Sequence, residues 1–333
     1  MGASSGEHRF WELLWLGSRT DRWSVVTPPG VQDNGGLTIA LASRGVLTAG
    51  FLPSINLHFS PLARTVDHGA TWSPELLPDG LAIGPDSLSS GPSQSLLALI
   101  SRRSGEVLKR SVPQGSWAVL TSAEALGRQA ATHDCELESI DAISASSEGR
   151  PLVGGPCQLP GQIGEYAYDR GRWRRAGPDV PTSLRAYTSA VLRLTSTPDG
   201  AFTLIELASA ASKDLLAAWS QNSGQHWREM PALRLQANQR VISAGPGPGS
   251  NAYVLTGIGR RAGALWVSAG PGSRWRATAA PPVDTAAVAI TGNSQISAFA
   301  VEGRTIHEWQ LEKGSRRWRP RQALRISISE REG

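Results

Sequence analysis

Short runs of apolar and β-branched residues recur along the chain, and glycine, proline, serine or asparagine separates each run from the next. Runs of this length between turn-forming residues are typical of β-strands. No segment carries a long helical period, and only residues 122–130 are compatible with one short helix. The pattern therefore predicts an all-β protein. Its clearest strands cover residues 95–100, 106–111, 135–145, 151–155, 190–195, 201–208, 214–219, 241–245, 252–257, 264–268 and 324–329.

Tryptophan gives this strand pattern a period. Successive steps of 49, 45, 56, 54, 48 and 43 residues join Trp23, Trp72, Trp117, Trp173, Trp227, Trp275 and Trp318. Steps of this size match one four-stranded propeller blade. A second set, Trp15, Trp219, Trp266 and Trp309, lies eight or nine residues before a tryptophan of the first set. Because eleven of the twelve tryptophans occupy repeat positions, we interpret them as core residues rather than as a carbohydrate-stacking surface.

The turn that precedes Trp72 is the most specific motif in the chain. Residues 65–72 read Thr-Val-Asp-His-Gly-Ala-Thr-Trp and fit the pattern Ser/Thr-x-Asp-x-Gly-x-Thr-Trp. Asp67 can accept hydrogen bonds from backbone N–H groups across such a turn, and Gly69 supplies a position with positive φ. A second copy at residues 220–227 has Asn for Asp and His for Thr, and a third at residues 268–275 lacks the acid.

This octet resembles the Asp-box of bacterial neuraminidase-type (BNR) repeats, which occur in propellers of the sialidase-like and sortilin-like superfamily. The resemblance implies a single β-propeller of four-stranded antiparallel blades, a repeat architecture like that of WD40 and YVTN proteins. It also implies that the box residues are structural. These residues are Thr65, Asp67, Gly69, Thr71 and Trp72 in the first copy, and Ser220, Asn222, Gly224 and Trp227 in the second.

The number of blades depends on how the two ends of the chain meet. We expect residues 1–8 to be a disordered tail and residues 9–333 to form the propeller. Six box-to-box units leave an N-terminal hairpin at residues 9–29 and a tail strand at residues 324–329. We favour seven blades, with the tail strand joining the hairpin. Alternatively, the tail strand extends the last blade and the propeller has six.

Two cysteines, Cys135 and Cys157, bear on the compartment. They fall at the start of one predicted strand and just after the end of its antiparallel neighbour, so they meet at one edge of a blade, near disulfide distance. A disulfide favours a secreted, periplasmic or cell-surface protein. The printed sequence starts Met-Gly-Ala-Ser-Ser-Gly without a signal segment, which favours the cytoplasm unless a signal has been removed. No apolar run is long enough to span a membrane.

The net charge of +5 comes almost entirely from arginine, because only three basic residues are lysine. We expect a basic face, interpreted as a solvated rim. The chain offers no recognition helix and no aromatics interleaved with arginine, which argues against nucleic acid as a partner. The arginines that flank the box turns are Arg170, Arg172, Arg174, Arg175, Arg274, Arg276, Arg316, Arg317, Arg319 and Arg321.

The opposite face holds the candidate binding residues. The loops that enter each blade converge there on the mouth of the central channel, and they carry Asp33, Asp86, Glu136, Arg185, Tyr187, Arg240 and Asp284. These side chains are typical of a polar-ligand site, although they would also serve to cap strands around a water-filled channel. The apolar loop at residues 52–60 either forms an exposed binding surface or plugs the channel.

Two functions compete. The resemblance to sialidases suggests a hydrolase, but the chain lacks an Arg-Ile-Pro motif, and Glu165 and Tyr166 are adjacent strand residues that point to opposite faces. A glycosidase that uses Asp33, Asp86 or Asp284 remains the alternative. The six histidines are scattered, and no metal, phosphate or nucleophile motif is present. We therefore favour a monomeric, non-enzymatic binding or scaffold propeller without a cofactor, which engages a protein or glycan.

Overall fold

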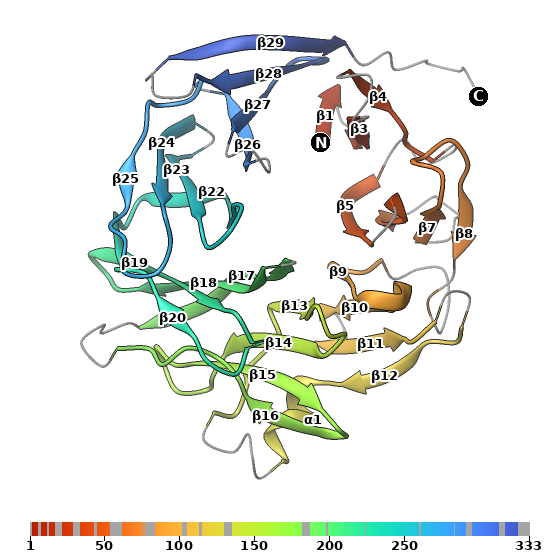
Figure 1. Ribbon diagram of the computed structural model, residues 1–333, viewed down its shortest axis with the longest axis vertical. Helices are drawn as coiled ribbons and strands as arrows, with labels where there is room; N and C mark the ends of the chain where they lie inside the picture. Colours follow the sequence, from red (N-terminus) through yellow and green to blue (C-terminus); the bar gives the residue numbers. More distant parts are fainter. Residues whose placement is uncertain are drawn as a thin grey trace.

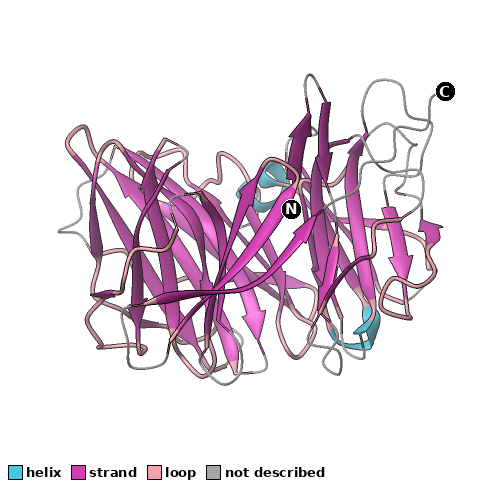
Figure 2. Cartoon of the chain, turned by 90° about the horizontal axis from the view of Figure 1, so that it is seen from above, coloured by secondary structure: helices cyan, strands magenta, loops and turns pink. Residues whose placement is uncertain are grey.

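The chain forms a ring of antiparallel sheets around a central channel, seen along its axis in Figure 1 and from the side in Figure 2. The computed structural model describes residues 2–5, 8–11, 13–16, 22–28, 34–42, 45–53, 62–75, 77, 84–101, 105–112, 115–129, 135–181, 187–197, 199–222, 224–259, 261–282, 284–290, 295–312 and 317–325. Six sheets consist of four consecutive strands each, and one of the six gains a fifth strand.

The strands follow the chain in simple up-and-down order within each blade. The first three blades are β5 (Asn34–Leu41), β6 (Leu47–Pro53), β7 (Leu62–Thr65) and β8 (Ser73–Glu75); β9 (Ser87–Ser90), β10 (Leu96–Ile100), β11 (Glu106–Arg110) and β12 (Ala118–Thr121); and β13 (Ala142–Ala145), β14 (Pro151–Pro156), β15 (Ile163–Asp169) and β16 (Arg172–Arg175). The last three are β17 (Thr188–Thr197), β18 (Gly200–Ala208), β19 (Ser212–Ser220) and β20 (Arg228–Glu229), with β21 (Leu233–Gln236) added to β19; β22 (Gln239–Pro246), β23 (Ala252–Ile258), β24 (Arg261–Ser268) and β25 (Arg276–Ala277); and β26 (Thr285–Ile290), β27 (Ile296–Glu302), β28 (Thr305–Leu311) and β29 (Trp318–Arg325).

These bounds confirm the predicted architecture of one propeller built from four-stranded antiparallel blades. The first strand of each blade lines the channel and the fourth lies at the rim (Figure 1). The predicted short helix is α1 (Ala123–Gly127), which begins where the Ser122 hydroxyl accepts a hydrogen bond from the Ala125 amide at 3.1 Å. One short 3-10 helix, η2 (Pro92–Gln94), joins β9 to β10. The strand predicted at residues 135–145 is shorter than expected. Only β13, at its end, is a regular strand, and nearer its start a single bridge pairs Leu137 with Cys157.

The ring closes with six blades, so the prediction of seven is wrong and the alternative is confirmed. Strand β29 begins at Trp318 and pairs with β28 up to Arg325, so the first two residues of the predicted tail strand extend the last blade, and residues 326–329 lie outside the described residues. The N-terminal residues form two separate two-stranded sheets, β1 (Gly2–Ser5) with β2 (His8–Trp11) and β3 (Leu14–Leu16) with β4 (Trp23–Val25). Strands of three or four residues offer the tail far fewer backbone hydrogen bonds than β28 does.

Strands β3 and β4 lie between the last blade and the first (Figure 1). Trp23 joins this hairpin to the last blade, because its indole nitrogen donates to Glu308 Oε2 at 3.0 Å and its ring packs edge-on against Phe299. Glu308 is 3% exposed and also accepts hydrogen bonds from Ser297 and Gln322. An apolar cavity of about 340 Å³ lies beside Trp23 and Glu308.

Tryptophan side chains connect several blades to the preceding blade or, in the first blade, to the N-terminal hairpin. The indole N–H of a box tryptophan donates to a backbone carbonyl in the preceding sheet. The acceptor residue comes just after the outermost strand of that sheet. The pairs are Trp72 with Val26 (2.9 Å), Trp227 with Ala176, Trp275 with Pro231 (2.8 Å) and Trp318 with Ala279 (3.1 Å). Each indole thus partly buries its ring and satisfies its only donor, which explains why tryptophan repeats at this position.

The box turn at residues 65–72 is held by its own side chains. Asp67 Oδ1 accepts from the Thr71 amide at 2.9 Å and from the Thr65 hydroxyl at 2.7 Å, while Asp67 Oδ2 accepts from the Thr71 hydroxyl at 2.6 Å. These hydrogen bonds, led by the one from the Thr71 hydroxyl, lower the pKa of Asp67 to about 2. The φ angle of Gly69 is +88°, and its missing Cβ would lie 2.5 Å from Val26 Cβ.

Candidate binding face at the channel mouth

Strand order places two sets of loops on one face of the ring. In an up-and-down blade, the start of the first strand and the turn between the second and third strands lie at the same end. The opposite end carries the box turns. We call the first end the channel-mouth face. The register of β13 to β15 shows the arrangement, because Ala142 pairs with Gly154 and Pro156 pairs with Ile163 towards the same end of the sheet.

Five of the seven predicted site residues are described, and all five are exposed. Asp86, Glu136, Tyr187 and Asp284 precede the first strands of four different blades, and Arg240 lies near the start of β22. Asp33 and Arg185 lie outside the described residues, as do residues 54–60 of the apolar loop. The fold thus distributes the five around one face. Within the described part of the chain, no hydrogen bond or ion pair joins any two of them.

Two of these charged side chains hold their own loops. Asp86 Oδ2 accepts a hydrogen bond from the Ser101 amide at 2.7 Å, which ties the start of β9 to the end of β10. The Arg240 Nε donates to the carbonyl of Gly259 in the neighbouring turn. Asp86 therefore acts locally as a strand cap, whereas the rest of the Arg240 guanidinium stays available because its side chain is exposed.

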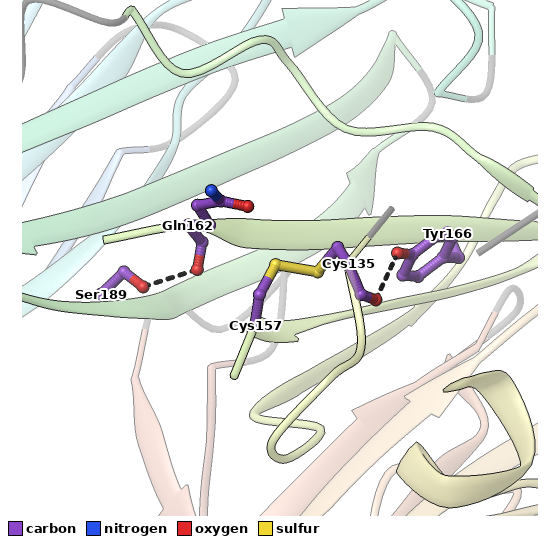
Figure 3. Close-up of a disulfide and its surroundings, with 5 residues drawn as sticks. All are labelled: Cys135, Cys157, Gln162, Tyr166 and Ser189. Carbon is purple, nitrogen blue, oxygen red and sulfur yellow. Dashed lines mark hydrogen bonds between the residues drawn. A yellow bond between two sulfur atoms is a disulfide. The ribbon is translucent and has the colours of Figure 1, made fainter. Parts of the chain in front are cut away.

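The predicted disulfide is confirmed and stiffens this face. Cys135 and Cys157 are bonded with a Cα–Cα distance of 5.2 Å, and both are buried (Figure 3). The Tyr166 hydroxyl donates to the Cys135 carbonyl at 3.0 Å. The loop that enters β13 is therefore held at Cys135 by this hydrogen bond as well as by the disulfide. In the next turn the Gln162 carbonyl accepts from the Ser189 hydroxyl at 2.7 Å, which ties this blade to the start of β17.

Large apolar side chains are exposed on the same face in three consecutive blades. Tyr187 is 73% exposed just before β17, Leu159 is 60% exposed in the turn between β14 and β15, and Ile258 is 55% exposed at the end of β23. The hydrogen bond between Ser189 and Gln162 holds the Tyr187 and Leu159 loops side by side. Neither Leu159 nor Ile258 was predicted from the sequence, because an apolar residue close to glycine at a turn was the only signal.

The channel behind this face is polar. A cavity of about 620 Å³ is lined by β5, β9, β13 and β17, with Asp141 and Arg193 among its charged residues. Several of its hydroxyls join neighbouring blades. Ser144 and Ser196 are 3.1 Å apart, the Ala145 amide donates to Ser89 at 3.0 Å, and the Ser90 hydroxyl donates to the Leu41 carbonyl at 2.5 Å. Much of the polar lining is therefore already used to hold the ring together.

Glu165 and Tyr166 face different neighbours, as their adjacent strand positions predict. Tyr166 packs toward β9 to β12 and bonds Cys135, whereas Glu165 is buried against the next blade, where the Thr203 hydroxyl donates to its Oε1. Burial raises the pKa of the Glu165 carboxyl to about 8, and the hydrogen bond from Thr203 only partly offsets this. Glu165 Oε2 has no hydrogen-bond partner. The two side chains thus cannot form a Tyr–Glu catalytic pair.

Among the described residues, no group of three or more His, Cys, Asp and Glu side chains is placed to hold a metal ion. No helix in the same ranges has the length and apolar character needed to cross a membrane.

Comparisons with known proteins place this chain in the class of single β-propellers. No family model and no curated protein matches the sequence. Among solved structures, YCF48 bound to a D1 peptide is 15% identical, with 89% of this chain and 86% of that chain covered and a TM-score of 0.53. YCF48 from Cyanidioschyzon merolae is 15% identical over 92% and 91% of the two chains, at a TM-score of 0.53. A protein from Lactobacillus plantarum is 11% identical over 97% and 94%, at 0.57. At these identities the likeness shows the fold alone.

Proposed function

We propose that this chain is a non-enzymatic binding or scaffold propeller that engages a protein partner through its channel-mouth face. The contact surface is the patch of Leu159, Tyr187, Arg240 and Ile258, called the mouth patch below. One observation carries this proposal. A tyrosine that is 73% exposed stands on a disulfide-stiffened face that also exposes two other large apolar side chains, each in an adjoining blade.

The composition of the mouth patch fits protein recognition better than solvation. Tyrosine and arginine are the residue types over-represented at binding hot spots, and exposed apolar groups that cluster on one face mark interaction surfaces. Loops fixed by a disulfide and by hydrogen bonds between blades lose little conformational freedom on binding. YCF48 has a similar fold and holds a D1 peptide, which supports a peptide or protein rather than a small molecule as the partner.

The carboxylates of this face give less support to catalysis. Asp86 is engaged by the Ser101 amide, and Asp86, Glu136 and Asp284 belong to three different blades. A two-carboxylate glycosidase needs its carboxyl groups about 5 to 10 Å apart across a bound sugar. Binding is therefore the better proposal. A glycan ligand would be detected by the glycan arm of the experiment below.

Two further assignments belong to this proposal. We assign the chain to the Asp-box (BNR) propellers, supported by the hydrogen bonds of residues 65–72 and by the repeated indole contacts between blades. We also propose that it is a monomer and that it has a secreted, periplasmic or cell-surface location; the disulfide supports the location.

Site-specific photocrosslinking tests the mouth patch. A photoreactive phenylalanine analogue is introduced at Tyr187 and, as a matched control, at Val119, which is 62% exposed on the outer strand β12. The proposal expects a discrete crosslinked protein from the position of Tyr187 and not from that of Val119. The affinity of the purified partner should then fall roughly tenfold or more in Tyr187→Ala and stay unchanged in Val119→Ala.

A thermal-shift screen against glycans, acidic sugars and peptides separates the alternatives. Stabilisation by a glycan that is lost in Asp86→Ala/Asp284→Ala, together with equal crosslinking from both positions, would overturn the proposal in favour of a carbohydrate site.

A further inference from the structure

The outer strand β16 concentrates positive charge on an open sheet edge. Its four residues read Arg-Trp-Arg-Arg, and Arg170 stands in the turn before it. Arg170, Arg172, Arg174 and Arg175, called the arginine edge below, are all exposed. Among the described residues, none of the four side chains forms an ion pair. The arginines of β29 differ, because Arg319 pairs with Glu312 and Arg321 with Glu308.

The strand that carries this charge is rigidly held. Trp173, its only apolar residue, is 2% exposed and packs in the core between two blades, with its ring centroid 5.1 Å from that of Tyr168. Because side chains alternate along a strand, Arg172 and Arg174 project together from the face opposite Trp173. The two guanidinium groups are thus presented at fixed spacing by a strand that is anchored in its middle.

The backbone of β16 offers unused hydrogen-bonding groups. In the described part of the chain β16 pairs only with β15, with Ala167 opposite Arg174 and Asp169 opposite Arg172. Just beyond the strand, the Ala176 amide donates to the Glu165 carbonyl at 2.8 Å. Hydrogen-bonded and non-hydrogen-bonded residue pairs alternate between antiparallel strands. Because Ala176 and Glu165 form a hydrogen-bonded pair, the pairs of Arg174 and Arg172, two and four residues earlier, are hydrogen-bonded as well. The N–H and C=O groups of Trp173 and Arg175 therefore point away from β15.

We propose that this edge binds an extended acidic peptide, which adds to the sheet as a further strand beside β16. The peptide backbone would bond the outward groups of Trp173 and Arg175, and carboxylates at every second position would lie next to Arg172 and Arg174. Strand addition takes its affinity from backbone hydrogen bonds and its specificity from alternate side chains. The four arginines have no acidic partner among the described residues and so supply the charge complementarity, and arginine bonds carboxylates with two parallel N–H groups. This site is independent of the mouth patch.

The probe for this site is a short fluorescent peptide that alternates glutamate with threonine, with binding followed by anisotropy in low-salt buffer. A companion peptide with glutamine in place of glutamate tests the need for charge. Two N-methylated versions, modified on odd or on even residues, test the backbone contacts, because only alternate N–H groups of an added strand face β16. The protein variants are Arg172→Glu/Arg174→Glu and, as a control of equal charge change, Arg274→Glu/Arg276→Glu at another outer strand.

The expected result is binding of the glutamate peptide, at least about tenfold weaker binding to Arg172→Glu/Arg174→Glu, and less than about twofold change for the control variant. Binding should also require glutamate and be abolished by only one of the two N-methylation patterns. If both protein variants lose the same affinity for the glutamate peptide, binding depends only on the overall charge of the protein, and the proposal is overturned. The same holds if both N-methylated peptides bind normally, or if the glutamate peptide does not bind at low salt. Thermal unfolding of each variant confirms that it is folded.

Discussion

Replacement of Glu165 by glutamine should change how stability depends on pH. Glu165 lies on β15 in contact with the next blade, and burial raises the pKa of its carboxyl from 4.5 to about 8. The folded protein therefore keeps this carboxyl neutral at pH 7, whereas the unfolded chain ionises it. Glutamine is neutral at every pH and its carbonyl oxygen can accept the same hydrogen bond from Thr203.

The sign and size of the effect follow from linkage. Below pH 4.5 the carboxyl is protonated in both the folded and unfolded states, so it adds no pH dependence. Between pH 4.5 and about 8 only the unfolded state loses its proton, and the free energy of unfolding falls with rising pH by about 1.4 kcal/mol per pH unit. The difference between 8 and 4.5 corresponds to roughly 5 kcal/mol lost by pH 8, and the loss is constant above that pH.

Urea unfolding from pH 4 to pH 9 measures this prediction, with Glu136→Gln on the exposed channel-mouth loop as the matched control. Glu165→Gln should match the wild type or be slightly less stable at pH 4, because its amide group gains no partner at the position of the unsatisfied Oε2. By pH 9 it should be several kcal/mol more stable than the wild type. If the difference between wild type and Glu165→Gln is the same at pH 4 and pH 9, burial does not raise the pKa of this carboxyl.

Three further predictions concern the ring and its turns. Trp23→Phe removes the indole donor to buried Glu308 and should lower the free energy of unfolding by about 1–3 kcal/mol, as measured by urea unfolding, whereas Trp266→Phe, whose buried indole nitrogen has no hydrogen-bond partner to lose, should lower it by less. Removal of the disulfide in Cys135→Ala/Cys157→Ala should lower the unfolding free energy by about 3 kcal/mol, given a sequence separation of 22 residues, and dithiothreitol should then have no additional effect. Asp67→Asn should lower the melting temperature at pH 4 and at pH 7 alike, because a carboxyl with a pKa of about 2 is ionised at both pH values, and an effect confined to pH 7 would contradict the hydrogen-bonded turn.

Much of the fold could be read from local patterns. The strand pattern and the tryptophan period predicted a propeller of four-stranded blades. This was possible because the same strands, turns and indole contacts recur from blade to blade. Cys135 and Cys157 could be paired because both lie within one hairpin, where the antiparallel register sets the distance between them. The positive φ at Gly69 likewise reflects a turn complete within eight residues.

The ring closure was not determined by local sequence. Strand β29 has eight residues, seven of which pair with β28, whereas β3 and β4 are only three residues long, so β29 completes the last blade and the blade count is six. Periodicity in a sequence counts repeats but carries no information about which long-range partner a terminal strand chooses, because that choice compares the total hydrogen bonding and burial of two arrangements.

The candidate site was likewise predicted only in part from the sequence. The sequence placed Tyr187 and Arg240 on the channel-mouth face, since strand order alone determines at which end of a blade a loop lies. Only the tertiary structure showed that Leu159 and Ile258 are exposed on the same face, and that Glu165 is buried in contact with the neighbouring blade. Exposure and pKa depend on atoms contributed by residues far away in the sequence, so these properties appeared only once the blades had packed against one another.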